Sequence, residues 1–292
     1  MKTTHHSEYL KLKSVFLKPA SHAFVSEELL MKQWSNLNYL SQPDYKKALD
    51  EYKVFEKYLS DEGVEVYHFP MDDSLSIDAV YCRDASIATD FGMILCNMGK
   101  SGRVKEPFSQ FQMYKATNIP ILGSIKSPGT LEGGDVAWLD EKTLAVGHTY
   151  RTNEEGIAQL KQLLEPKGVE IIVAELPHYK GKEDVFHLMS ILSPIASDLA
   201  VVYSPLMPIK FRNELINRGF SFVEVSDEEF ISMGCNVLAI APRKCLMVEG
   251  NPNTKALLLK AGCEVLTYKG AEISLKGGGG PTCLTRPLLR MF

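Results

Sequence analysis

The sequence lacks the features that mark membrane, secreted and nucleic-acid-binding chains. No apolar run in its 292 residues approaches the length of a membrane span, and the N-terminal Met-Lys-Thr-Thr-His-His has no apolar stretch like that of a signal peptide. The formal net charge is only −4, and acidic and basic residues are interspersed. We therefore expect a cytoplasmic protein with no nucleic-acid partner and no membrane partner.

Metal-binding cysteine patterns are also missing. The six cysteines include no Cys-x-x-Cys pair, and no cysteine–histidine cluster has the spacing of a zinc site. In a cytoplasmic chain of this size, free thiols are expected rather than a disulfide framework. Most of the cysteines lie in apolar, strand-like runs and are interpreted as small core residues. Cys283 differs, because it follows four glycines and a proline.

No linker or low-complexity stretch divides the chain, but a helix followed by a glycine and a strand recurs along it. Apolar residues at helical spacing precede a glycine and a β-branched run in four places. The four glycines are Gly63, Gly168, Gly219 and Gly262. A glycine just past a helix is the usual left-handed cap, so each segment predicts a helix leading into a strand.

Hairpins are predicted between these helix–strand pieces, at Ala85–Cys96, Asp135–Val146 and Val237–Val248. The repeating unit is then strand, strand, helix, strand. Four copies are clear, and a fifth can be assembled either from residues 98–123 or by joining the two chain ends. A ring of such units would leave a central channel where loops converge. The alternative is an ordinary α/β domain whose connections happen to look alike.

Four short stretches carry chemically reactive side chains in the order Asp, Glu, His, Cys. They are Tyr81–Asp84, Leu131–Asp135, Val185–Leu188 and Gly277–Cys283. A cysteine nucleophile needs a lowered pKa or a nearby base, which a histidine can supply. Carboxylates in the same pocket would suit a cationic, planar guanidinium group. Glycines before the cysteine would let the backbone approach a ligand closely.

Each stretch also has a simpler structural explanation. Gly277–Gly280 alone is a flexible turn, and it lacks the Gly-Lys-Ser/Thr ending of a phosphate-binding loop. Glu132-Gly-Gly-Asp alone is a turn leading into a strand. His187 alone is a satisfied, partly buried histidine, and Arg83-Asp84 alone is a surface ion pair. Spacing by itself leaves both interpretations open.

The sequences of these motifs resemble the guanidino-group-modifying enzyme superfamily, which includes dimethylarginine dimethylaminohydrolases, arginine deiminases and amidinotransferases. The resemblance is carried, in order along the chain, by Arg83-Asp84, Leu131–Val136, Val146–Gly156, His187–Ser190 and Gly277–Cys283. It spans residues from about 15 to 292. It implies an α/β fold, the pentein, which is a five-fold pseudosymmetric propeller of strand-strand-helix-strand units. Residues 1–292 would then form a single catalytic domain.

The resemblance also implies catalytic roles. Cys283 would attack the guanidinium carbon and form a covalent thiouronium-type intermediate. His187 would protonate the departing amine and then activate water. Glu132 and Asp84 would hold the guanidinium nitrogens and share the positive charge. No metal or organic cofactor is implied.

Further residues are implied as substrate contacts. Arg151 would bind the substrate α-carboxylate, and Arg103 is a second candidate for that role. An exposed arginine near a turn is the alternative interpretation of Arg151. Tyr81 and Asp135, which lie in the same motifs, complete the set of expected substrate-binding residues.

Met189 bears on the choice of substrate. Deiminases and amidinotransferases usually have His-x-Asp at the histidine, and Met189 stands in place of that aspartate. Its loss should weaken binding of free arginine and leave room for an alkylated nitrogen. The segment ending at Cys283, by contrast, is closer to the deiminase pattern.

The prediction is therefore a hydrolase of the dimethylarginine dimethylaminohydrolase type, which converts methylated arginine to citrulline and an amine. Arginine hydrolysis or amidino transfer is the alternative, followed by a non-catalytic binding protein on the same scaffold. The expected partner is a small guanidino substrate, and a homodimer is left open.

Overall fold

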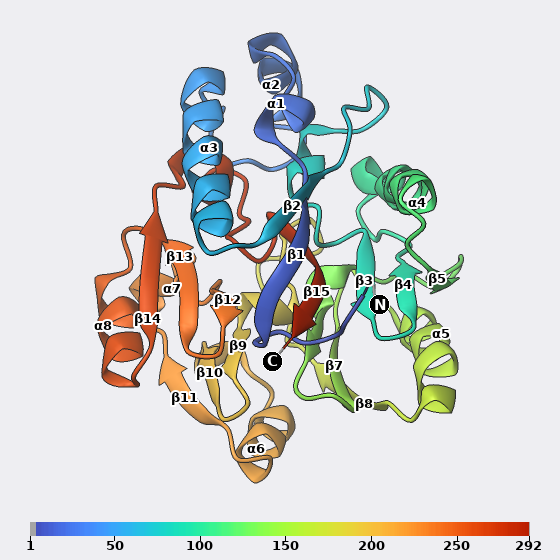
Figure 1. Ribbon diagram of the computed structural model, residues 1–292, viewed down its shortest axis with the longest axis vertical. Helices are drawn as coiled ribbons and strands as arrows, with labels where there is room; N and C mark the ends of the chain where they lie inside the picture. The colour runs from blue at the N-terminus through green and yellow to red at the C-terminus, as the bar shows by residue number, and fades with distance from the viewer. Residues whose placement is uncertain (1–3, 292) are drawn as a thin grey trace.

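Five three-stranded sheets are arranged as a ring in the computed structural model, which describes residues 4–291 (Figure 1). The strands are β1 (Lys11–Leu17), β2 (Glu65–His68), β3 (Ser86–Thr89), β4 (Gly92–Leu95), β5 (Ile121–Ser124), β6 (Val136–Trp138), β7 (Thr143–His148), β8 (Glu170–Glu175), β9 (Leu192–Ala196), β10 (Leu199–Val202), β11 (Ser221–Glu224), β12 (Leu238–Ala241), β13 (Lys244–Val248), β14 (Glu264–Tyr268) and β15 (Thr285–Met291). The helices are α1 (Ala20–Ala23), α2 (Glu27–Gln33), α3 (Tyr45–Asp61), α4 (Glu106–Ala116), α5 (Glu154–Leu164), α6 (Ile209–Asn217), α7 (Asp227–Ile231) and α8 (Pro252–Lys260). The predicted domain also includes residues 1–3 and 292, which lie outside the described part of the chain.

All five sheets have the same internal order. The first two strands pair antiparallel, and the third lies parallel to the second, as in β3-β4-β5 and β6-β7-β8. A parallel pair needs a crossover connection, and a helix supplies it in each unit. The crossover helices α3, α4, α5, α6 and α8 lie around the outside of the ring (Figure 1). The predicted fold class and repeating unit are thus confirmed.

Residues 98–123 and the joined chain ends were the two options for completing a fifth unit. The structure contains both, and each completes a different unit. Residues 98–123 supply α4 and β5, which complete the sheet begun by β3 and β4. The two chain ends supply another sheet, because β15 pairs antiparallel with β1, and β1 pairs parallel with β2. Figure 1 shows these strands side by side near the centre of the view.

The glycines that follow the helices adopt the left-handed conformation predicted for them. Gly63, Gly168, Gly219 and Gly262 have φ angles of 75°, 82°, 88° and 80°. At the corresponding place after α4, Asn118 has a φ of 56°. Asparagine tolerates the left-handed conformation at some cost. The fifth helix–strand pair therefore lacks the glycine that marked the other four.

Helix α3 shows how the outer helices are fixed to the sheets. Its buried residues are Ala48, Tyr52, Phe55 and Leu59, the apolar positions that predicted the helix. The Asp44 side chain caps its first turn by accepting a hydrogen bond from the Lys47 backbone N–H at 3.0 Å. Phe55 is fully buried, and truncating such a side chain to alanine costs about 3–5 kcal/mol.

The ring places five loops at its centre, each leading into the first strand of a three-stranded unit. These loops precede β3, β6, β9, β12 and β15. No helix in residues 4–291 is long and apolar enough to cross a membrane.

Candidate active site

Each of the five central loops contributes one polar or reactive side chain. Asp84 precedes β3, Glu132 precedes β6, His187 precedes β9, Asn236 precedes β12 and Cys283 precedes β15. All except Glu132 line one cavity of about 200 Å³. Residues that are distant in sequence therefore meet because the fold repeats, with one contribution from every unit.

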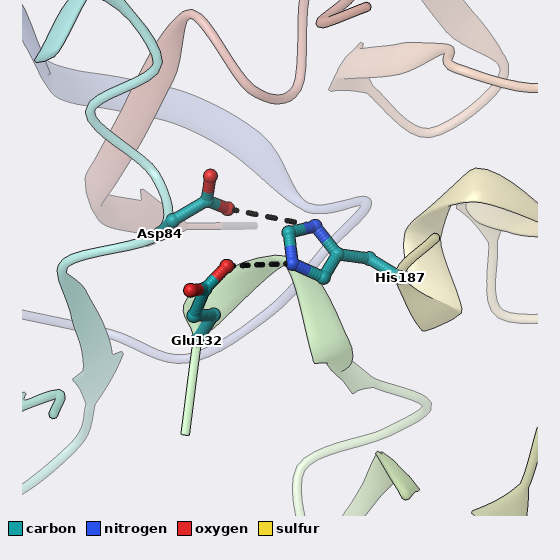
Figure 2. Close-up of side chains that lie close together, drawn as sticks. All are labelled: Asp84, Glu132 and His187. Atoms are coloured by element: carbon teal, nitrogen blue, oxygen red, sulfur yellow. Dashed lines mark hydrogen bonds and ion pairs between the residues drawn. The ribbon is translucent and has the colours of Figure 1, made fainter. Parts of the chain in front are cut away.

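His187 lies between two buried carboxylates (Figure 2). Its Nε2 atom is 2.9 Å from Glu132 Oε2, and its Nδ1 atom is 4.0 Å from Asp84 Oδ1. Burial alone would lower the pKa of His187, but the charges of Asp135 and Asp84 and the hydrogen bond to Glu132 outweigh it and raise the pKa to about 9. The imidazole is therefore protonated at neutral pH, with Nε2 bonded to Glu132 and Nδ1 facing Asp84 (Figure 2).

Glu132 contacts His187 but does not line the cavity. Its Oε1 atom accepts a hydrogen bond from the Lys100 backbone N–H at 3.0 Å and lies 3.6 Å from Arg151 Nη1. Burial raises the pKa of Glu132, but the hydrogen bond from His187 and the charges of His187 and Arg151 outweigh this and lower the pKa to about 2. Both oxygens are thus occupied by protein groups. That Glu132 directly holds the guanidinium stays a prediction.

Asp84 keeps one carboxylate oxygen available. Its Oδ2 atom accepts a hydrogen bond from Arg103 Nη1, whereas within residues 4–291 its Oδ1 atom has no hydrogen-bond partner. A buried carboxylate oxygen without a donor is costly, so Asp84 is prepared for a cationic ligand that carries N–H groups.

Arg103 lines the cavity and is also bound by several protein acceptors. Its guanidinium also donates to Glu106 through Nε and Nη2 and to the Tyr81 carbonyl, each at 2.8 Å. With these acceptors and Asp84 satisfied, Arg103 holds the Asp84 carboxylate in place. Its predicted contact with the substrate carboxylate stays a prediction.

Asp135 is likewise enclosed by protein donors and does not line the cavity. It accepts hydrogen bonds from Thr149 Oγ1, Thr152 Oγ1 and the Leu188 backbone N–H at 2.8, 2.7 and 3.0 Å. Burial raises its pKa to about 6, against the opposing effects of the His187 charge and these hydrogen bonds. Asp135 therefore ties the loop that carries His187 to its neighbours, and its contact with substrate stays a prediction.

Arg151 and Tyr81, both predicted to contact substrate, line the cavity. Arg151 is 4% exposed, so it is not the exposed arginine of the alternative interpretation. Within residues 4–291, its charged partner is Glu132 at 3.6 Å, which leaves much of its guanidinium free to bind an anion. The ring of Tyr81 is buried against the glycine-rich segment, and this burial raises the pKa of Tyr81 well above its usual value.

Cys283 is the half-buried cysteine, and the other five are buried free thiols. Its sulfur is 3.2 Å from Asn236 Nδ2 and 3.8 Å from Thr282 Oγ1. Burial and the nearby Asp84 carboxylate raise the pKa of Cys283, and the two hydrogen bonds partly offset this effect. Without a bound cation, the thiol is thus mainly protonated at neutral pH.

The glycines of the motifs are needed for close approach. A Cβ on Gly134 would lie 2.3 Å from His187 Nδ1 and 2.7 Å from Asp84 Oδ1. A Cβ on Gly277 or Gly279 would collide with Tyr81, and a Cβ on Gly280 would lie 2.5 Å from Asn236 Oδ1. Any side chain at these positions would occupy the space of the site itself.

Asp84, Glu132 and His187 also offer one potential metal-ligand atom each, and these atoms lie within 4.8 Å of one another. A metal requires a neutral imidazole. The raised pKa of His187 means that a proton competes with any cation at this position.

Asn236 was missed from the sequence, although a signal for it exists. Asp84 and Glu132 stand just before a predicted hairpin, and Cys283 stands at the end of the glycine-rich segment. Asn236 stands just before the predicted hairpin Val237–Val248. Comparing the same position in every unit would have found it.

A five-unit ring with a cysteine, a histidine and carboxylates around its central cavity defines the pentein class of guanidino-group-modifying enzymes, which act on guanidino C–N bonds. Comparison with known proteins agrees with this class. The family model described as "N,N dimethylarginine dimethylhydrolase, eukaryotic" matches residues 25–290. The chain belongs to this family.

Relatives with two different activities are found. The chain is 25% identical to N(G),N(G)-dimethylarginine dimethylaminohydrolase of Pseudomonas aeruginosa, over 85% of this chain and 91% of that protein. It is also 25% identical to arginine deiminase of Mycoplasma capricolum, over 85% of this chain and 72% of that protein. In structure it is similar to SxtG, an amidinotransferase from Microseira wollei, with a TM-score of 0.81 at 15% identity over 99% of this chain and 98% of that one. At that identity, the likeness to SxtG concerns the fold.

Proposed function

We propose that the protein hydrolyses an Nω-substituted arginine to citrulline and an amine through a covalent intermediate on Cys283. The observation that carries the proposal is the composition of the cavity wall. The free Oδ1 of Asp84, His187 and Cys283 line one cavity, and Met189 lines the same cavity. This wall provides one anchor for a cation, a proton donor and a nucleophile.

Substrate binding activates the nucleophile in this scheme. The guanidinium donates N–H groups to Asp84, and its positive charge lies next to the Cys283 sulfur. Because Asp84 and burial raise the pKa of the thiol in the empty site, a bound cation that neutralises Asp84 shifts the thiol toward thiolate. Exclusion of water strengthens this electrostatic effect.

The chemistry then proceeds in two displacements. The thiolate attacks the guanidinium carbon to form a C–S bond, and the substituted amine leaves with a proton from His187. The neutral imidazole next takes a proton from water, which attacks the same carbon. The C–S bond breaks, the thiolate is released and citrulline remains. Glu132 supports both steps by fixing His187 through Nε2, which leaves Nδ1 for the proton transfers.

Substrate selection is assigned to two residues on the cavity wall. Met189 is 3% exposed and apolar, so it can contact alkyl groups on the departing nitrogen but cannot accept a hydrogen bond from an unsubstituted one. Arg151 is a buried cation at the wall whose charged partner within residues 4–291 is Glu132 at 3.6 Å, and we assign the substrate α-carboxylate to it.

The direct test is to incubate the purified protein with arginine and with mono- and dimethylated arginines and to measure citrulline. Faster formation of citrulline from the methylated compounds is expected. Cys283→Ser should abolish turnover of all of them. Turnover of arginine alone would overturn the substrate assignment, and unchanged turnover in Cys283→Ser would overturn the mechanism.

Arginine itself is the second candidate substrate. The similarity to arginine deiminases favours it, because the same nucleophile, histidine and Asp84 would serve that reaction. A chain that transfers the amidino group would instead need an acceptor amine, and ping-pong kinetics that depend on such an amine would identify it.

A further inference from the structure

The side-chain amide of Asn236 makes the shortest polar contact of the Cys283 sulfur. Its Nδ2 atom lies 3.2 Å from Sγ, whereas Thr282 Oγ1 lies 3.8 Å away. Asn236 is 6% exposed and lines the cavity together with Cys283. It therefore contacts the atom that forms the covalent bond in the proposed reaction.

The orientation of this amide is fixed by its other partners. Asn236 Oδ1 accepts hydrogen bonds from the Thr282 backbone N–H at 3.0 Å and from Thr282 Oγ1 at 2.8 Å. A backbone N–H can only donate, so the atom facing it must be the amide oxygen. The NH₂ group then faces the sulfur. Because an amide NH₂ can only donate, the sulfur must accept, which a thiolate does better than a thiol.

The neighbouring backbone fixes Asn236 and leaves room for its side chain. Its N–H donates to the Met233 carbonyl at 3.0 Å, which closes a turn after α7. On the opposite side Gly280 has no side chain, and a Cβ there would lie 2.5 Å from both Cγ and Oδ1 of Asn236. The glycine before the nucleophile thus creates the space that the amide fills.

A thiolate at Cys283 requires a hydrogen-bond donor because its other surroundings disfavour a negative charge. Asp84 places a negative charge on the same cavity wall, and a thiolate there would be repelled and desolvated. His187 is hydrogen-bonded to Glu132 through Nε2. Asn236 also lies in the loop before the first strand of its unit, as Asp84, His187 and Cys283 do in theirs.

We propose that Asn236 is a catalytic residue that donates a hydrogen bond to the Cys283 thiolate, stabilising it before attack and again when it leaves. The role in turnover rests on the proposed function. The contact with the Cys283 sulfur does not, because it exists in the protein without substrate.

The test measures alkylation of Cys283 by iodoacetamide as a function of pH, with the modified peptide quantified by mass spectrometry. Asn236→Ala removes the donor, and its apparent thiol pKa should rise by about one unit or more, with about tenfold slower alkylation at neutral pH. Asn236→Asp keeps the shape of the side chain but replaces the donor by an anion. The pKa of the Cys283 thiol should therefore rise further than in Asn236→Ala. If Asn236 donates to the thiolate, the pKa of the Cys283 thiol is highest in Asn236→Asp, lower in Asn236→Ala and lowest in the wild type.

Two controls separate this role from a structural one. Asn153→Ala removes the cap of α5, which accepts from the Gly156 N–H at 2.8 Å, outside the cavity. It should lower stability and leave the alkylation profile unchanged. Thr282→Val removes the hydroxyl but keeps the backbone N–H that orients the amide, and it should shift the profile less than Asn236→Ala.

The outcomes are distinct for the two proposals. If the Asn236→Ala and Asn236→Asp profiles coincide with that of the wild type, the contact does not stabilise the thiolate and the inference is wrong. If the profiles shift as expected but no guanidine is turned over, the proposed function fails and the inference stands. If turnover occurs, Asn236→Ala should lower kcat about tenfold or more with little change in KM.

Discussion

Replacing Glu132 by glutamine tests how the site keeps His187 protonated. The pKa of His187 lies at about 9 although burial lowers it, because Asp135, Asp84 and the hydrogen bond to Glu132 act in the opposite direction. Loss of an opposite charge in direct contact typically shifts a pKa by about 1–3 units. The pKa of His187 should therefore fall to roughly 6–8 in Glu132→Gln.

The activity should change in a specific way. His187 gives its proton to the departing amine in the proposed mechanism, so kcat requires the protonated form. With a pKa near 9, roughly nine-tenths of the wild-type imidazole is protonated at pH 8, and with a pKa near 7 only about one-tenth is. The alkaline limb of the kcat–pH profile should thus move to lower pH by about 1–3 units.

Two measurements check this expectation. One is the kcat–pH profile, and the other is the titration of the imidazole nitrogens by NMR, assigned with His187→Gln. Glu175→Gln is the matched control, because Glu175 Oε2 lies 2.6 Å from Nδ1 of His148 in a more exposed pair outside the cavity. It should leave both measurements unchanged. An unchanged alkaline limb and an unchanged His187 titration in Glu132→Gln would refute the reasoning.

Three further results are expected. Gly134→Ala would place a methyl group 2.3 Å from His187 Nδ1 and 2.7 Å from Asp84 Oδ1, so kcat should fall at least about 100-fold; near-normal kinetics would show that the close packing is unnecessary. Because the pKa of His187 is raised from 6.5 to about 9, its contribution to stability is fully present below about pH 6.5 and is lost as pH rises through about 9. The unfolding free energy should fall by up to about 3 kcal/mol over this range, and denaturant titrations should show no such difference in His187→Gln. Met189→Asp adds an acceptor for an unsubstituted nitrogen, so the ratio of kcat/KM for arginine over dimethylarginine should rise; an unchanged ratio would remove Met189 from substrate selection.

Much of the fold was predictable because its signals are local. Apolar spacing and a glycine after the helix identified four helix–strand pairs, since both depend on neighbouring residues. The pair α4–β5 was less clear because Asn118 replaces the glycine. The pairing of β15 with β1 could only be offered as one option, because the two strands lie at opposite ends of the chain.

The sequence predicted which residues form the site better than it predicted the contacts that those residues make. The motifs placed Asp84, His187 and Cys283 together, and these residues line one cavity. Arg103 and Asp135 were expected to contact substrate, but each is enclosed by protein partners. Sequence order does not show which atoms of a buried charge are already satisfied, because that depends on side chains from other units.

The pairing of β15 with β1 has a consequence for how the protein is made. During synthesis β1 emerges among the first elements, but its antiparallel partner is the last strand to appear. Until then the ring has a gap, and an edge of β1 stays unpaired. The loop that carries Cys283 leads directly into β15, so the segment that closes the ring also delivers the nucleophile. A nascent chain therefore cannot assemble the reactive centre before the circle is complete, and ring closure and catalytic competence are reached in a single step.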